Sequence, residues 1–137
     1  MRSLHSDIIS TLAGATFSID DVSVRKPFDE SAKHYPMLVV YELNNTPHNH
    51  ATVNGEARTN LSYQVSVLTQ NCQDSDGNAL SRWEAGRLLV QEVGDLLDNT
   101  YKLTRRSITE LSTSADIMEF VWRGEAVLDS AGYSYRA

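Results

Sequence analysis

The feature that most constrains this chain is a strictly alternating run from Leu61 to Thr69. Apolar and polar residues alternate along it. The apolar residues are Leu61, Tyr63, Val65 and Val67, and the polar residues between them are Ser62, Gln64 and Ser66. Because successive side chains of a strand point to opposite faces, the run predicts a half-buried β-strand with an apolar side and a polar side. Such a strand needs neighbouring strands at its edges and apolar cover over one face.

Four further segments are predicted to be extended. Met37 to Leu43 alternates with apolar residues on both faces, which indicates a strand covered on two sides over part of its length. Ile117 to Leu128 alternates between an apolar face and a face that mixes charged residues with valines, and a strand is also predicted from Tyr101 to Leu111. A shorter extended segment, interrupted by acidic residues, is predicted between Thr16 and Arg25.

Two helices are predicted from apolar residues that recur at helical spacing. Ser3 to Ala13 carries such a stripe, and Gly14 is expected to end this helix in the left-handed conformation. A longer helix is predicted from about Ala79 to Asp98. Its apolar stripe contains Leu80, Trp83, Arg87, Val90, Val93 and Leu97, widened by Leu89 and Leu96.

The start of the long helix is left open by a second signal. Ser81 and Glu84 have the spacing of a capping box, which would place the start one turn later than Ala79.

The order of these elements predicts an α+β fold. We expect a mostly antiparallel sheet of about four to five strands, with the short N-terminal helix and the long helix packed on one face. A length of 137 residues favours one domain spanning residues 1–137. Within it, residues 44–60 are expected to project as a polar loop or as a hairpin with Asn54-Gly55 at its turn, and residues 131–137 to form a surface tail.

Charge and composition exclude several classes of protein. The 12 basic and 18 acidic residues give a net charge of −6, which is unfavourable for a protein that grips phosphates. Cys72 is the only cysteine, so no disulfide can form within the chain. No apolar run approaches the ~18 residues of a membrane span, and the first residues do not have the pattern of a signal peptide. We therefore expect no membrane association and an intracellular or particle-borne setting.

Three patterns could carry chemistry. His48 and His50 could hold a metal in a small hydrolase or nuclease, but no following helix offers a further ligand, so solvated loop histidines are favoured. Asp74, Asp76 and Asn78 begin like a calcium loop, but Ala79 and Ala85 stand where Gly and Glu are required. Cys72 lies in a polar stretch that does not favour a nucleophile. The chain is therefore predicted not to be an enzyme, with no catalytic, cofactor-binding or metal-binding residues.

The one basic cluster contains Arg105 and Arg106. On a strand these two side chains face opposite sides, so they do not form one patch. One of them is expected to meet Glu119 or Glu125 across the sheet, and the other could reach a neighbouring subunit.

Several of these segments together resemble a known family. They are Tyr35-Pro36-Met37-Leu38-Val39-Val40-Tyr41-Glu42-Leu43, Leu61-Ser62-Tyr63-Gln64-Val65-Ser66-Val67, the helix with Ala85 and Leu88-Leu89, and Phe120-Val121-Trp122-Arg123-Gly124-Glu125-Ala126. Their order, spacing and chain length resemble the tail terminator (tail completion, or minor capsid) proteins of long-tailed bacteriophages, the group that includes the lambda U protein. The resemblance covers roughly residues 3 to 128 and rests on patterns, none of which is diagnostic alone.

The resemblance implies a structural virion protein. Subunits of that family form a ring, with six members, at the head-proximal end of the tail. The ring caps the tail tube, stops its polymerisation and offers a surface to the neck proteins. DNA passes through the lumen without specific binding. The family has no catalytic residues, so the resemblance implies no cofactor, and it places the protein at the head–tail junction after synthesis in the host cytoplasm.

The residues predicted to contact other subunits or the tube lie on the projecting segment and on the last two strands. They are His48, His50, Asn54, Gly55, Arg105, Arg106, Arg123 and Glu125. Another neck component, a head-completion protein or connector adaptor, remains the alternative. A metal-dependent hydrolase or nuclease that uses His48 and His50 is less favoured.

Overall fold

A five-stranded sheet organises the chain. The computed structural model describes residues 4–29, 33–47, 58–112, 114 and 116–129. Its elements are α1 (Leu4–Gly14), β1 (Ser23–Arg25), β2 (Met37–Pro47), β3 (Arg58–Thr69), β4 (Cys72–Gln73), β5 (Ala79–Leu80), α2 (Arg82–Tyr101), β6 (Thr104–Ser112) and β7 (Met118–Asp129). The sheet order is β1-β2-β3-β7-β6, and only β1 and β2 run parallel. This confirms the predicted α+β class.

The alternating strand lies at the centre of the sheet. β3 pairs antiparallel with β2 on one side and with β7 on the other, so that Val65 lies between Val40 and Trp122. Its apolar side chains are buried, as predicted. Central placement explains the strength of the alternation, because both edges of this strand are occupied and only its two faces differ in environment.

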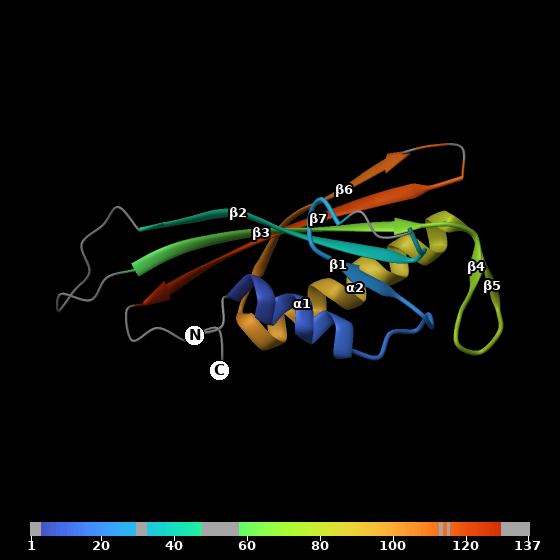
Figure 1. The fold of residues 1–137 in the computed structure, drawn as a ribbon, viewed down its shortest axis with the longest axis horizontal. Helices are drawn as coiled ribbons and strands as arrows, with labels where there is room; N and C mark the ends of the chain where they lie inside the picture. Colours follow the sequence, from blue (N-terminus) through green and yellow to red (C-terminus); the bar gives the residue numbers. More distant parts are fainter. Residues whose placement is uncertain (1–3, 30–32, 48–57, 113, 115, 130–137) are drawn as a thin grey trace.

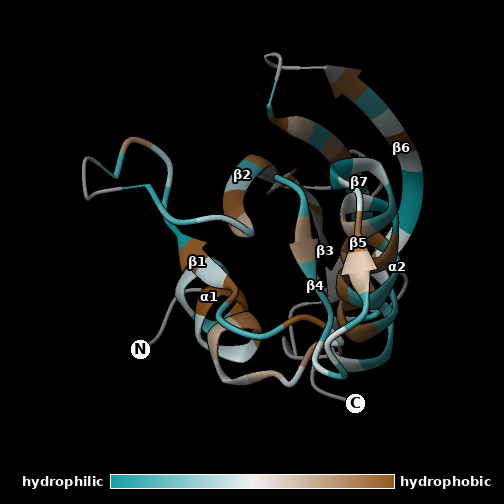
Figure 2. Ribbon diagram, turned by 90° about the vertical axis from the view of Figure 1, so that its right-hand side faces the viewer, coloured by the Kyte–Doolittle hydropathy of each residue, from teal (hydrophilic) through white to brown (hydrophobic). Residues whose placement is uncertain are grey.

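Both helices cover the same face of the sheet (Figure 1). α1 packs against β1 and β2, whereas α2 lies across β3, β7 and β6 (Figure 2). Between the helices and the sheet lies the core, which contains the largest fully buried side chains, among them Trp122, Tyr63 and Tyr101. The segregation of helices to one face was predicted. The helices cover only the face of β2 that carries Leu38 and Val40. Met37 on the other face is also buried, so the predicted burial of both faces is confirmed at the start of the strand, whereas Val39 and Tyr41 are half-buried.

Glycines allow α2 to approach β7 closely. A Cβ on Gly86 would lie 2.5 Å from Cδ1 of Phe120, and a Cβ on Gly94 would lie 2.9 Å from Nε1 of Trp122. Real side chains do not reach such separations, so both positions require glycine unless an aromatic ring moves. Two turns of the helix therefore rest directly on the aromatic residues of the strand.

A buried polar cluster joins α1 to the end of α2. The hydroxyl of Tyr101 lies 3.1 Å from the carbonyl oxygen of Asp7 and 2.5 Å from Oγ1 of Thr11. Asp7 and Tyr101 are both buried. Buried polar groups are costly without partners, so these hydrogen bonds favour one position of α1 relative to the end of α2.

The start of α2 corrects one prediction and supports its alternative. Ser81 is the N-cap and Glu84 completes the capping box, so the helix begins at Arg82, one turn later than Ala79. Ala79 and Leu80 instead form β5, which pairs with β4. The predicted apolar stripe is confirmed at Leu89, Val90, Val93 and Leu97, which are buried. It is wrong at Trp83 and Arg87, which are exposed, and Ala85 and Gly86 face the core in their place.

Two boundaries differ from the sequence pattern. Tyr101 ends α2 and does not begin a strand, and Lys102 takes the left-handed conformation (φ 59°) that turns the chain into β6. Gly14 is the last residue of α1 and does not have a positive φ, so the predicted left-handed stop is wrong. At Tyr101 tertiary packing decides the boundary, because this side chain is buried at the end of the helix.

The segment predicted to project is partly formed by strands. β2 extends to Pro47 and β3 begins at Arg58, with Pro47 paired to Thr59, which is the arrangement of two hairpin arms. The ends of β2 and β3 reach beyond the helices (Figure 1). His48, His50, Asn54, Gly55 and the predicted tail at 131–137 lie outside the described residues.

The close approach of α2 to β7 gives a first prediction. Gly86→Ala gains about 1 kcal/mol of helix propensity but overpacks the core, which costs about 1–3 kcal/mol. We expect the free energy of unfolding to fall by about 1 kcal/mol in urea titrations. Gly14→Ala is the matched control, because a Cβ there meets nothing within 4 Å, and stability should be unchanged or higher. Equal stability of the two variants would contradict the packing argument.

Candidate functional site

No helix covers the second face of the sheet within the described part of the chain. This surface, called the open face below, consists of the outward residues of β2, β3, β7 and β6. Cross-strand pairing arranges them in three rows: Met37, Leu68, Glu119 and Leu111; Val39, Ser66, Val121 and Thr109; and Tyr41, Gln64, Arg123 and Ser107. Apolar side chains concentrate on β2, and charged side chains on β7.

The open face is more apolar than an ordinary solvated sheet surface. Leu43 and Leu111 are 48% and 46% exposed, and Val39 and Tyr41 are half-buried. Leu43 is the extra residue of a β-bulge between Glu42 and Asn44, which directs it outward. A face that gathers large apolar side chains in this way indicates a contact surface for another protein.

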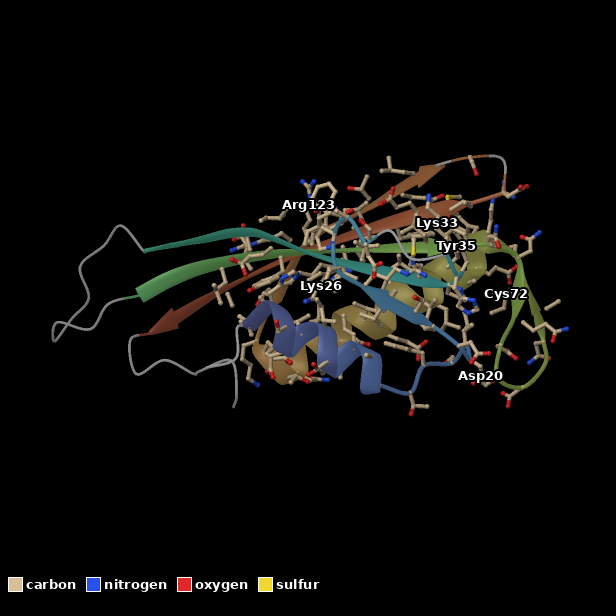
Figure 3. All side chains as sticks on the ribbon, in the orientation of Figure 1. Asp20, Lys26, Lys33, Tyr35, Cys72 and Arg123 are labelled. Atoms are coloured by element: carbon tan, nitrogen blue, oxygen red, sulfur yellow. The ribbon has the colours of Figure 1, made fainter. Side chains whose placement is uncertain are left out.

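Three of the predicted contact residues, Arg106, Arg123 and Glu125, lie on this face. Arg106 forms an ion pair with Glu125, with 3.0 Å between Nε and Oε2, as expected for one of the two arginines. Arg123 donates from Nε to Oε1 of Gln64 at 3.0 Å and lies on the uncovered side of the sheet (Figure 3). The Arg106–Glu125 side chains are 64% and 50% exposed, so the pair contributes under about 1 kcal/mol to stability and remains available to a partner.

Arg105 lies on the other side of the sheet, as the alternation predicted. It lines a hollow of about 280 Å³ between α2 and the edge strand β6, called the edge hollow below. The residues around it are Val90, Gln91, Gly94, Asp95, Asp98, Arg105, Ile108 and Trp122. The buried indole N–H of Trp122 has no hydrogen-bond partner among the described residues.

A second hollow, of about 350 Å³, lies on the exposed side of α2. Trp83, Arg87, Leu88 and Gln91 line it together with Glu84, and the guanidinium of Arg87 lies 5.2 Å from the centre of the Trp83 ring. Gln91 also borders the edge hollow, so the two depressions are neighbours. The sequence pattern had placed Trp83 and Arg87 on the buried side of the helix and therefore missed this surface.

The residues proposed for metal chemistry do not converge in the described part of the chain. There, no three His, Cys, Asp or Glu side chains gather to hold an ion. Asp74 instead closes its own turn: Oδ1 accepts from the backbone N–H groups of Asp76 and Asn78, both at 2.9 Å. These hydrogen bonds, foremost that from Asn78, lower the pKa of Asp74.

Cys72 lies on the small β4–β5 ribbon (Figure 3). Burial raises the pKa of its thiol, and the neighbouring Asp74 carboxylate raises it further. A raised pKa lowers the thiolate fraction at neutral pH, which is the opposite of what nucleophilic catalysis requires.

The ribbon itself is anchored to the linker after α1. Ser75 donates its backbone N–H to the carbonyl oxygen of Ser18 at 2.8 Å, and Ser18 donates to the carboxylate of Glu92 on α2. These hydrogen bonds indicate that the β4–β5 ribbon has a structural role.

No family model matches the chain, and no curated protein matches its sequence. Neither helix in the described residues is long and apolar enough to cross a membrane.

The electrostatic setting of Cys72 gives a second prediction. Alkylation by iodoacetamide should be slower in the folded protein than in the urea-unfolded chain at the same pH. The rate should rise only above the pH at which an ordinary cysteine ionises, because the folded thiol holds its proton more tightly. Mass spectrometry of timed samples measures both rates. A reaction midpoint below that of the unfolded chain would contradict the assignment.

Proposed function

We propose that this protein is a structural subunit of a bacteriophage tail, a tail terminator that assembles with copies of itself into a ring on the head-proximal end of the tail tube. In this role the ring stops tube polymerisation and offers a docking surface to the neck. The segments that resemble this family occupy β2, β3, α2 and β7, which pack together as one sheet and one covering helix. The resemblance therefore concerns a contiguous part of the fold.

The open face is the observation that carries this proposal. Exposed leucines, together with half-buried aromatic and β-branched residues on a sheet face that no helix covers, support a contact with another protein there. Apolar residues on β2 and a charged group on β7 give this face both the apolar contact and the orienting polar contacts found in protein interfaces. We assign this surface to an unlike partner, the tube or the neck.

The two edges of the sheet suit a ring. β1 is three residues long and β6 is nine, so the edges differ in length and in side chains. Contacts between unlike surfaces of identical subunits propagate head to tail and close into a ring when the rotation between neighbours permits. Two different edges on one chain supply the two surfaces that such a contact needs.

The charge of the chain agrees with a lumen that does not hold DNA. With a net charge of −6, the subunit repels phosphates on average. A ring of such subunits would therefore let DNA pass without retaining it.

Deletion from the producing phage tests the proposed function. Particles without the protein should show tails of uncontrolled length that are not joined to heads, seen by negative-stain electron microscopy. Supplying the wild-type chain in trans should restore tail length and attachment. Normal tails on normal particles after deletion would contradict the proposal.

A surface variant makes the test specific to the open face. Leu43→Arg places a charge on a side chain that is 48% exposed, so the fold should be retained in circular dichroism. We expect this variant to fail to restore joined tails, because a charge would be buried in the contact with the tube or neck. Lys102→Ala, on the loop between α2 and β6, is the exposed control and should restore them.

A further inference from the structure

Phe28 is the most exposed large apolar residue of the described chain. It is 97% exposed and lies in a turn formed by Lys26 to Asp29, called the Phe28 turn below. The backbone N–H of Asp29 lies 3.4 Å from the carbonyl oxygen of Lys26, with Pro27 and Phe28 at the two central positions. Proline in the second position and a positive φ in the third are the features of a type II turn.

The conformation of Phe28 is unfavourable for its side chain. Its φ is +63°, in the left-handed region where the third position of this turn favours glycine. A bulky residue there is strained, and complete exposure of its ring adds an unfavourable contact with water. Neither folding nor turn formation benefits from this choice of residue, so a contact with another molecule is the physical reason that remains.

The Phe28 turn and the edge hollow lie at opposite edges of the sheet. The turn follows β1, the first strand in the sheet order, and stands away from the body of the molecule in Figure 2. The edge hollow lies beside β6, the last strand in that order, with the half-buried Ile108 among its walls. One chain therefore carries an apolar projection at one edge and a partly apolar depression at the other.

Charges around the two features are complementary. Lys26 lies two residues before Phe28, and its ammonium forms no ion pair within the described residues. Asp95 and Asp98 border the edge hollow, are exposed, and likewise have no ionic partner in the described part of the chain. Asp29 belongs to the turn and Arg105 to the hollow, so charges of both signs are present at both features. Opposite charges of this kind fix the register of a contact.

We propose that the Phe28 turn of one copy enters the edge hollow of the next copy, with Phe28 against Ile108 and Lys26 beside Asp95 and Asp98. The contact joins unlike surfaces, so it repeats from subunit to subunit and can close into a ring, whereas a two-fold contact stops at a dimer. This inference rests on the proposed function, since it names the contact between copies that a ring requires.

Site-directed cross-linking tests which surfaces meet. The background is Cys72→Ala, to which Phe28→Cys and Gln91→Cys are added together, because Gln91 is exposed and borders the hollow. A short bis-maleimide should convert the double variant into a ladder of dimers, trimers and larger species on a denaturing gel. Each single variant should give no species above a dimer. A double variant that gives no more than the single variants would overturn the proposed contact.

The assembly state of surface variants provides a second, independent measurement. Phe28→Asn removes the aromatic side chain and places at this position a residue that tolerates a positive φ, so the fold should stay intact. We expect the concentration needed for assembly to rise at least 10-fold in sedimentation velocity. Leu43→Ser, which removes an apolar side chain from the open face, is the matched control and should assemble as the wild type does. Assembly of Phe28→Asn at the wild-type concentration would contradict the proposal.

Charge exchange tests the pairing of Lys26 with Asp95. Recovery in the double variant also shows that the single variants are folded, because a misfolded chain could not regain assembly. Lys26→Asp and Asp95→Lys should each weaken assembly, and the chain with both changes should regain part of it, because each contact then contains the reversed pair. Additive weakening in the double variant would count against the pairing of these residues.

The outcomes also separate this contact from the proposed function. A wild-type chain that stays monomeric throughout the sedimentation series but restores tail length in trans contradicts the contact alone. A chain that assembles through the Phe28 turn but whose deletion leaves tails normal supports the contact and contradicts the proposed function.

Discussion

The direct contact between α2 and the aromatic residues of β7 determines most of this structure. Gly86 and Gly94 bring the helix backbone onto Phe120 and Trp122, which removes the space that side chains on the helix would otherwise fill. Both the direction of α2 and its distance from the sheet are then fixed. α1 covers the rest of the same face and is joined to the end of α2 by the hydrogen bonds of Tyr101. Because these contacts use both helices on one face, no helix covers the opposite face of the sheet within the described chain.

Separate surfaces follow from this arrangement, and they can serve separate partners. The open face is broad and has its polar contacts on β7, whereas the two edges carry local features, a projecting turn and a hollow. In an assembled ring the edges would be used between copies, and the open face would remain accessible for the tube or the neck. A fold with helices on both faces would not separate the two kinds of contact in this way.

Much of the fold could be predicted because its signals are local. The alternation from Leu61 to Thr69 and the two segments around it specify the central strands, and the capping box at Ser81 marks the start of α2 correctly. The errors came from properties of the packed state. Trp83 and Arg87 fit a helical stripe but point to solvent, because Gly86 and Ala85 let the opposite side of the helix approach the sheet. Small residues carry no hydrophobic signal that would have indicated this.

The candidate site was predictable only in part. Alternation was sufficient to place Arg105 and Arg106 on opposite sides and to suggest Glu125 as a partner, since cross-strand neighbours follow from strand order. Phe28 gave no comparable signal, because it is a single apolar residue between a proline and a charged run. The inference that Phe28 contacts another molecule depends on its exposure and on its positive φ, and both are properties of the folded chain.

The irregularity in β6 bears on how the protein behaves when it is abundant. The register of β6 against β7 shifts between Arg105 and Ser107, which leaves Arg106 as an extra residue in an edge strand. A bulge with a charged side chain makes a free strand a poor template for continuous pairing with other chains. Under the proposed function, a subunit that accumulates before its particle is ready would thereby stay free of fibrous aggregates, because neighbours would add at this edge only through a specific fit of side chains.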